Sequence, residues 1–189
     1  MQFDTVTPLI KRFNNLIDAL IKDFKEFNLD DDAIIFLAQR TRNFINFTKI
    51  AFLKVILIIL ERDETKFDFK EILDDINQMV DAVFEGLNKL LDDILAKEDE
   101  DAHAHAHSHS HSHAHEHHDI EVDNLQEYLD KITEYLGFIK KLLGDTCEIV
   151  LSSLKYKNRE ITEKEYNDKY NAFKENINSY KKEFEQKFQ

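Results

Sequence analysis

The chain contains very little glycine and proline. Its 189 residues include three glycines and one proline, which are too few for the many turns of a multi-stranded fold. Leucine, isoleucine, lysine, glutamate, aspartate and phenylalanine are abundant instead, and this composition suits long helices. A chain of this length forms one ordinary domain with a sizeable core. The composition therefore predicts a single all-α domain over residues 1–189.

The chain has a single cysteine, and its N-terminus lacks the pattern of a signal peptide. Because Cys147 is the only cysteine, no disulfide can form within the chain, and cysteine usage favours neither a reducing nor an oxidising compartment. The N-terminus has no basic stretch followed by an apolar run, so we expect no signal peptide. A cytoplasmic protein and a trimmed secreted protein both fit this sequence.

No continuous apolar run has the length of a membrane span. The most apolar stretch, from Ile50 to Leu60, is interrupted by Lys54 and falls short of the roughly 18 residues that suggest a transmembrane helix. We therefore expect no transmembrane segment. The stretch is interpreted as the most buried part of a helix.

Positive charge is in deficit, because the formal net charge is −13. Nucleic acids and anionic membranes bind proteins that supply positive charge, so we expect neither as an unassisted partner of this chain. Cations or basic proteins fit the charge better.

Enzymatic motifs are absent as well. The sequence has no phosphate-binding glycine loop and no Gly-x-Ser-x-Gly motif. The predicted helices contain no histidine, which excludes a di-iron site built from Glu-x-x-His pairs. Cys147 fits a small core side chain better than a reactive thiol, and the aspartates, which include Asp74, Asp75, Asp92 and Asp93, fit a solvated face. We predict a protein that is not an enzyme.

Apolar residues recur at spacings of three and four residues in five blocks, the periodicity of helices that share a core. Pro8 suits the first turn of the first helix. The polar cluster at residues 28–32 is expected to end that helix and to cap the second one, which is expected to be central. A capping box at Thr162–Glu165 begins the last helix, whose apolar seam is aromatic and whose position is expected to be peripheral. Short connections favour an up-and-down bundle. The blocks span about residues 6–27, 32–62, 67–97, 125–154 and 162–184.

Two glycines lie seven residues apart in the fourth predicted helix. Gly137 and Gly144 therefore share a face of that helix. They either allow close approach of a neighbouring helix or are simply tolerated, at about 1 kcal/mol each relative to alanine.

All nine histidines lie between His103 and His118, and eight of them occupy alternate positions. Small or acidic residues separate them, and acidic residues flank the run at Glu98–Asp101 and at Asp119. A stretch with almost no large apolar side chain cannot offset the entropy of ordering it. We therefore expect residues 98–121 to form a flexible acidic, histidine-rich loop between the third and fourth helices.

Histidine imidazole is the commonest protein ligand for zinc and also suits nickel and copper. Alternate side chains of an extended segment point to one side, so a fold-back can gather three or four imidazoles around an ion. The segment then has room for about two ions. The predicted ligands are His103, His105, His107, His109, His111, His113, His115, His117 and His118, with Asp101, Glu116 and Asp119 as auxiliary ligands.

The histidine run resembles, in composition, the histidine-rich loops of zinc transporters and of some metal chaperones. This resemblance covers fewer than 20 residues, extends to no fold and implies no mechanism for this chain. Three other interpretations stay open: neutral low-complexity expansion, an inserted tag-like segment, and a pH-responsive segment. Protonation would add nine positive charges to a chain of formal net charge −13.

The sequence as a whole predicts a soluble five-helix bundle that binds zinc, nickel or copper loosely through its histidines, as a buffer, carrier or sensor. An alternative uses the helices themselves. In that case an amphipathic bundle binds a lipid, another apolar ligand or a protein partner, and the histidine loop is incidental. Self-association through the aromatic last helix is a further expectation.

Overall fold

Five helical rods make up the described part of the chain in the computed structural model, which covers residues 3–26, 30–61, 67, 69–105 and 122–188. No strand occurs in these residues. The all-α fold with five helices is confirmed. The second rod is continuous and consists of three segments. The elements are α1 (Phe3–Glu26), α2 (Asp31–Phe47), η1 (Thr48–Phe52), α3 (Leu53–Glu61), α4 (Lys70–His105), α5 (Val122–Lys157) and α6 (Glu163–Lys187).

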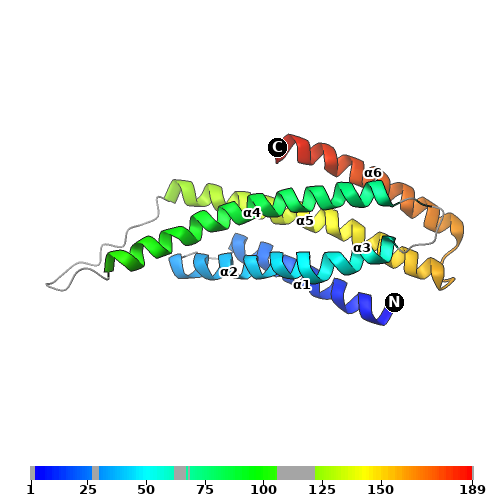
Figure 1. Ribbon diagram of the computed structural model, residues 1–189, viewed down its shortest axis with the longest axis horizontal. Coiled ribbons are helices and arrows are strands. Elements are labelled where there is room, and N and C mark those ends of the chain that lie inside the picture. Colours follow the sequence, from blue (N-terminus) through cyan, green and yellow to red (C-terminus); the bar gives the residue numbers. More distant parts are fainter. Residues whose placement is uncertain (1–2, 27–29, 62–66, 68, 106–121, 189) are drawn as a thin grey trace.

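The rods lie side by side along the long axis of the molecule, and successive rods run in alternate directions (Figure 1). Helix α5 packs against α1, α3, α4 and α6, so α5 takes the central position that the sequence assigned to the second rod. The second rod keeps an exposed side instead, where 66% of the Ile50 surface and 36% of the Ile58 surface are accessible. The expectation that the second rod is the central helix is therefore wrong, and residues 50–60, interpreted as the most buried part of a helix, are buried on one side only. Hydropathy measures how apolar a helix is, but not how many of its sides have a neighbour.

The predicted apolar seams meet in one core. Phe13 of α1 is fully buried, and its ring stacks on Phe52 of η1 with the centroids 4.3 Å apart. The seam of α5 is continuous through Cys147, as expected. The seam of α6 is buried as well, at Tyr166, Tyr170, Phe173, Ile177 and Phe184.

Two predicted helix starts are confirmed by their caps. The Asp30 side chain accepts a hydrogen bond of 2.9 Å from the Ala33 backbone N–H at the start of α2. At the start of α6, Thr162 and Glu165 form both hydrogen bonds of the capping box. These bonds satisfy backbone donors that have no partner within the helix.

Helix α1 begins earlier than the sequence indicated. It starts at Phe3, so Pro8 lies inside the helix and not in its first turn. Burial of Val6, which is fully enclosed in the core, explains the extra turn. Pro8 itself is exposed, so water can satisfy the carbonyl that its missing N–H leaves without a helical partner.

Helix α4 ends later than the sequence indicated. It continues through residues 98–101 to His105, so the predicted loop over residues 98–121 is wrong for its first part. The loop was predicted from the lack of apolar side chains. Glutamate and alanine, however, are good helix formers whether or not they are buried. Residues 106–121 lie outside the described residues.

The three glycines occupy two kinds of environment. A Cβ added at Gly137 or Gly144 would meet no atom within 4 Å, so the second interpretation of this pair, simple tolerance, is confirmed. A Cβ at Gly86 of α4 would lie 2.7 Å from the ring of Tyr135 of α5. Of the three glycines, only Gly86 has a neighbouring side chain in the place that a Cβ would take.

We expect Gly137→Ala and Gly144→Ala each to raise the free energy of unfolding by about 0.5–1 kcal/mol, because alanine restricts the unfolded chain and suits a helix. Gly86→Ala is expected to lower it, because the Tyr135 ring must leave its place against Phe188, whose ring centroid is 4.9 Å away. Urea unfolding followed by circular dichroism measures all three. Equal shifts for the three variants would contradict the packing at Gly86.

The second rod contains a π-helical turn, η1, with an unusual threonine at its first residue. Thr48 is fully buried, and its hydroxyl is the one buried side-chain polar atom in the described residues that has no hydrogen-bond partner. Thr41 and Thr146 differ, because each donates a 2.7 Å hydrogen bond to the carbonyl four residues earlier. A buried hydroxyl without a partner destabilises the folded state.

We expect Thr48→Val to raise the free energy of unfolding by about 1 kcal/mol, because valine keeps the shape and removes the desolvated hydroxyl. Thr146→Val is the matched control. It loses a hydrogen bond and is expected to lower stability by about 0.5–1.5 kcal/mol. Urea midpoints distinguish the two, and a destabilised Thr48→Val variant would indicate a partner for that hydroxyl.

Candidate metal-binding site

The structure places only part of the predicted ligand set. The backbone of Asp101, His103 and His105 belongs to the last turns of α4, and their side chains are not described. The remaining predicted ligands lie outside the described residues: His107, His109, His111, His113, His115, Glu116, His117, His118 and Asp119. Their role as ligands stays a prediction.

The helices before and after the histidine segment, α4 and α5, contact one another. Near the end of the bundle, Arg42 of α2 forms an ion pair with Asp92 of α4, and the Tyr128 hydroxyl of α5 donates a 3.4 Å hydrogen bond to Asp93. In Figure 1 the last turns of α4 extend past the ends of α2 and α5. The histidine segment therefore begins beyond the packed body of the bundle.

The described residues contain no alternative metal site, because no group of three or more histidine, cysteine, aspartate or glutamate side chains among them is arranged to hold an ion. Cys147 is buried, and its burial raises the pKa of the thiol to about 12. A thiol with that pKa stays protonated near neutral pH, as expected of a core side chain. The interpretation of Cys147 as a core side chain is confirmed.

The aspartates of α4 are surface residues, as expected. Asp74, Asp92 and Asp93 are exposed and Asp75 is half-buried. Asp75 accepts a 2.7 Å hydrogen bond from Lys181 of α6. Asp75 and Asp92 form ion pairs with neighbouring helices at the surface, where each ion pair contributes little stability.

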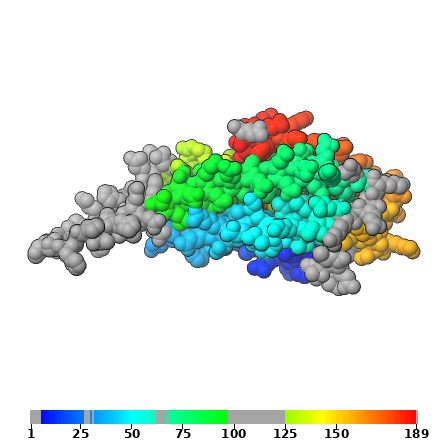
Figure 2. Space-filling view, viewed as in Figure 1, coloured from blue at the N-terminus to red at the C-terminus, as the bar shows by residue number. Residues whose placement is uncertain are grey.

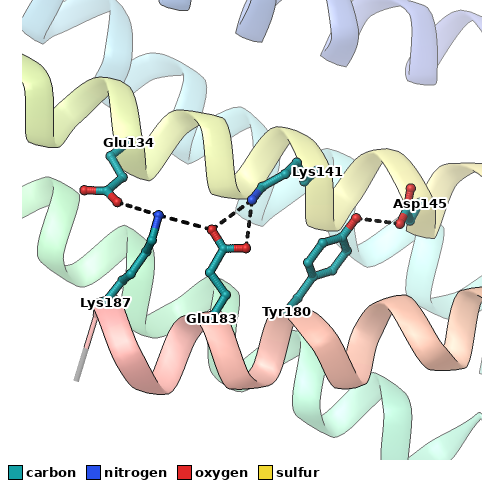
Figure 3. Close-up of polar contacts among 6 residues, drawn as sticks. All are labelled: Glu134, Lys141, Asp145, Tyr180, Glu183 and Lys187. Carbon is teal, nitrogen blue, oxygen red and sulfur yellow. Dashed lines mark hydrogen bonds and ion pairs between the residues drawn. The ribbon is translucent and has the colours of Figure 1, made fainter.

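A row of ion pairs joins α5 to α6, and sequence analysis missed it (Figure 3). Lys187 lies 2.9 Å from Glu134 and 3.4 Å from Glu183, and Lys141 lies 2.8 Å from Glu183. The hydrogen bond from Lys141 lowers the pKa of Glu183, and Lys187 lowers it further. Glu183 therefore links two lysines from two helices.

A tyrosine continues this row towards the start of α6. The Tyr180 hydroxyl donates a 2.7 Å hydrogen bond to Asp145, which also accepts a 2.9 Å bond from Asn176 (Figure 3 shows the first). Burial raises the pKa of Tyr180, and the bond to Asp145 adds to that rise. The row holds α5 against α6, because each of its carboxylates accepts a hydrogen bond or forms an ion pair with a side chain of the facing helix. The sequence carried a clue to it, namely charged residues beside the aromatic seam.

The apolar side of α6 is buried against other helices of the same chain. Its seam residues are buried, and Phe184 and Phe188 lie against Phe138 of α5 with ring centroids 6.2 and 5.0 Å away. Self-association through α6 stays a prediction, but it would have to use a side of α6 other than this seam.

Two hollows lie on the surface of the described residues. One, of about 380 Å³, lies beside Leu60, Phe69 and Asp74, and the other, of about 290 Å³, lies between α5 and α6 beside Glu148 and Asp168. Both open to solvent and are lined by polar as well as apolar groups. Neither resembles the enclosed apolar cavity that a lipid bound in the core would need.

Comparison with protein-family models, with curated proteins and with solved structures gave no match to this chain. The function of this chain is therefore inferred from its own residues alone. Among them, the histidine segment has the most distinctive chemistry.

Proposed function

We propose that this protein binds divalent transition metal ions, namely zinc, nickel or copper, through the histidines between residues 103 and 118. It acts as a buffer, carrier or sensor of the metal and not as an enzyme. One observation carries the proposal: nine histidines occur within this segment and none occurs in the rest of the chain. A segregation of this kind favours a dedicated ligand segment over a catalytic residue or a core side chain.

The chemistry requires neutral imidazoles, each of which gives one nitrogen lone pair to the ion. Three or four of them complete most zinc shells, so the segment must fold back on itself to bring them to one ion. The acidic residues at 98–101 attract cations to the same end of the bundle. Ligands drawn from a repeated pattern are interchangeable, and for this reason we propose loose binding with ready exchange.

The histidine segment is tested by calorimetric titration of zinc, nickel and copper into the intact protein. A variant in which a Gly/Ser linker of equal length replaces residues 102–118 serves as the comparison. We expect the intact protein to bind about two ions at micromolar affinity or better, and the variant to bind none. Equal binding by both proteins, or no binding by the intact protein, would exclude the segment as the metal site.

Thermal melts of the same two proteins separate a sensor from a buffer. If metal binding is coupled to the bundle, the melting temperature of the intact protein rises with metal concentration, as mass action requires. Binding without any shift of the melt assigns the segment to passive buffering or carriage. The linker variant controls for metal effects on the helices themselves.

A further inference from the structure

The hollow of about 290 Å³ between α5 and α6 combines an apolar lining with acidic groups. Helix α6 packs against α4 and α5 and lies along the edge of the molecule (Figure 2). The buried side chains of Ile149 and Phe173 line the hollow. Three carboxylates line it as well, those of Asp145, Glu148 and Asp168. The hollow therefore suits a ligand that is both cationic and partly apolar.

The hollow is a gap in the row of contacts that joins α6 to α5. Each member of the row on α6 contacts a charged side chain of α5, and these members are Lys169, Asn176, Tyr180, Glu183 and Lys187. Residue 172 follows Lys169 by three positions and precedes Asn176 by four, so it belongs to the same side of the helix. It is an alanine, whose side chain is too short to cross to α5. The hollow lies where a longer side chain would complete the row.

Negative charge exceeds positive charge among the residues that line the hollow. Three carboxylates and one ammonium group, that of Lys169, line it. Lys169 lies 3.2 Å from Glu148 and pairs with it. Asp145 accepts its two hydrogen bonds from neutral groups of α6. Within the described residues, neither Asp145 nor Asp168 forms an ion pair.

The two carboxylates without a cation lie towards opposite ends of the hollow. Asp145 accepts a hydrogen bond from Asn176, and Asp168 precedes Asn176 by eight residues, which is about 12 Å along a helix. Two ammonium groups joined by four methylene carbons are about 6 Å apart when extended, and a hydrogen bond of about 2.8 Å at each end gives a total reach of about 12 Å. A short diammonium ion therefore matches the spacing.

We propose that the hollow between α5 and α6 binds a short aliphatic diammonium ion such as 1,4-diaminobutane. One ammonium group donates hydrogen bonds to Asp145 and the other to Asp168. The methylene chain lies over Ala172 and against the apolar side chains of Ile149 and Phe173. The ion thus supplies the length and the positive charge that Ala172 does not supply to the row. This site uses none of the histidines and does not depend on the proposed metal binding.

Other ligands fit the hollow less well. The acidic side chains of the described residues are not arranged in a group that could hold a metal ion. An anion would be repelled by Asp145 and Asp168. A monoammonium ion, including the lysine side chain of a partner protein, would leave one of these two carboxylates without a cation. A diammonium ion pairs with both.

Titration of the full-length, metal-free protein with 1,4-diaminobutane, followed by the NMR shifts of its backbone amides, tests the proposal. The buffer contains about 0.15 M salt, which screens the general attraction of cations to an acidic protein. We expect a dissociation constant of about 1 mM or lower and the largest shifts within residues 145–152 and 168–176. Butylamine has the same carbon chain with one ammonium group and is expected to bind about fivefold more weakly, because it forms one ion pair fewer.

A variant that fills the hollow tests its role directly. Ala172→Leu places a side chain where the methylene chain would lie and is expected to bind diaminobutane at least about tenfold more weakly. Asn171→Leu is the matched control, because residue 171 is also exposed on α6 but does not line the hollow. It is expected to bind like the wild type. Both positions are exposed, so both variants are expected to keep the wild-type melt.

A charge-matched pair tests the contact with Asp168. Asp168→Asn and Glu175→Gln each remove one negative charge from the exposed surface of α6. The first is expected to bind diaminobutane about fivefold more weakly, because one ion pair is lost. The second changes a residue outside the hollow and is expected to leave the dissociation constant unchanged.

Four results would overturn the proposal. They are the absence of titrating shifts, shifts spread over the acidic residues of all helices, equal binding of butylamine, and unchanged binding by Ala172→Leu. Spread shifts would assign the binding to the net charge of the protein. Equal binding of butylamine would assign the hollow to a single ammonium group, such as the lysine side chain of a partner protein.

Discussion

Replacing Phe13 by alanine is expected to lower the free energy of unfolding by about 3–5 kcal/mol. The Phe13 side chain is fully buried. Its ring stacks on Phe52 at 4.3 Å between centroids and lies 5.7 Å from the ring of Phe44. One residue of α1 thus contacts both α2 and η1. Alanine would remove these contacts and leave a cavity beside the π-helical turn. Urea unfolding followed by circular dichroism measures the loss.

Phe36→Ala is the matched control, because 58% of the Phe36 surface is accessible. Its effect is expected to stay within about 0.5–1 kcal/mol of the wild type. If Phe13→Ala does not fold, Phe13→Leu keeps most of the volume and is expected to cost about 1–1.5 kcal/mol. A loss below about 1 kcal/mol for Phe13→Ala would contradict the packing of α1 on the second rod.

Helix existence could be predicted from the sequence because the apolar period is long and regular. The seam of α5 keeps its step through Cys147 over many turns, and the structure buries that residue in one continuous helix. The caps at Asp30 and Thr162 could also be predicted, because each is a local pattern of a few residues. Local interactions of this kind depend on nearby residues alone.

Helix partners could not be predicted in the same way. Apolar periodicity shows which side of a helix is buried, but not against which helix it packs. The sequence placed Ile50 to Leu60 at the centre, whereas the structure leaves Ile50 and Ile58 exposed and places α5 in the middle. The π-helical turn at Thr48–Phe52 was not predicted either, since such turns are rare single turns within α-helices.

The candidate site shows the opposite balance. Its ligand chemistry is evident from the sequence, because nine histidines within one short segment supply many nitrogen ligands. Its geometry is not, since the structure describes only the backbone of His103 and His105 among the nine histidines. A repeated pattern offers many equivalent sets of three or four ligands. The composition therefore predicts that the segment can bind metal, but it does not determine which histidines bind a given ion.

Acidification from about pH 7.5 to about pH 5 is expected to weaken metal binding by about four orders of magnitude. Imidazole binds a metal ion only in its neutral form, and its ordinary pKa is about 6.5. At about pH 5 protonation weakens each imidazole ligand by about 1.5 decades, so an ion held by three of them is released. Carboxylates titrate lower and would keep their metal at this pH. Titration calorimetry at the two pH values measures the change.

The helices are expected to stay folded during this change, and this separates loss of ligands from loss of the fold. The pKa of Glu183 is lowered in the folded protein by Lys141 and Lys187. The stability that this carboxylate contributes is therefore complete above its ordinary pKa of about 4.3 and is lost only as the pH falls through the lowered value. Circular dichroism at both pH values checks the fold. A loss of affinity below about tenfold, with the helices intact, would assign the metal to carboxylates, because imidazoles cannot hold an ion equally well on both sides of their own pKa.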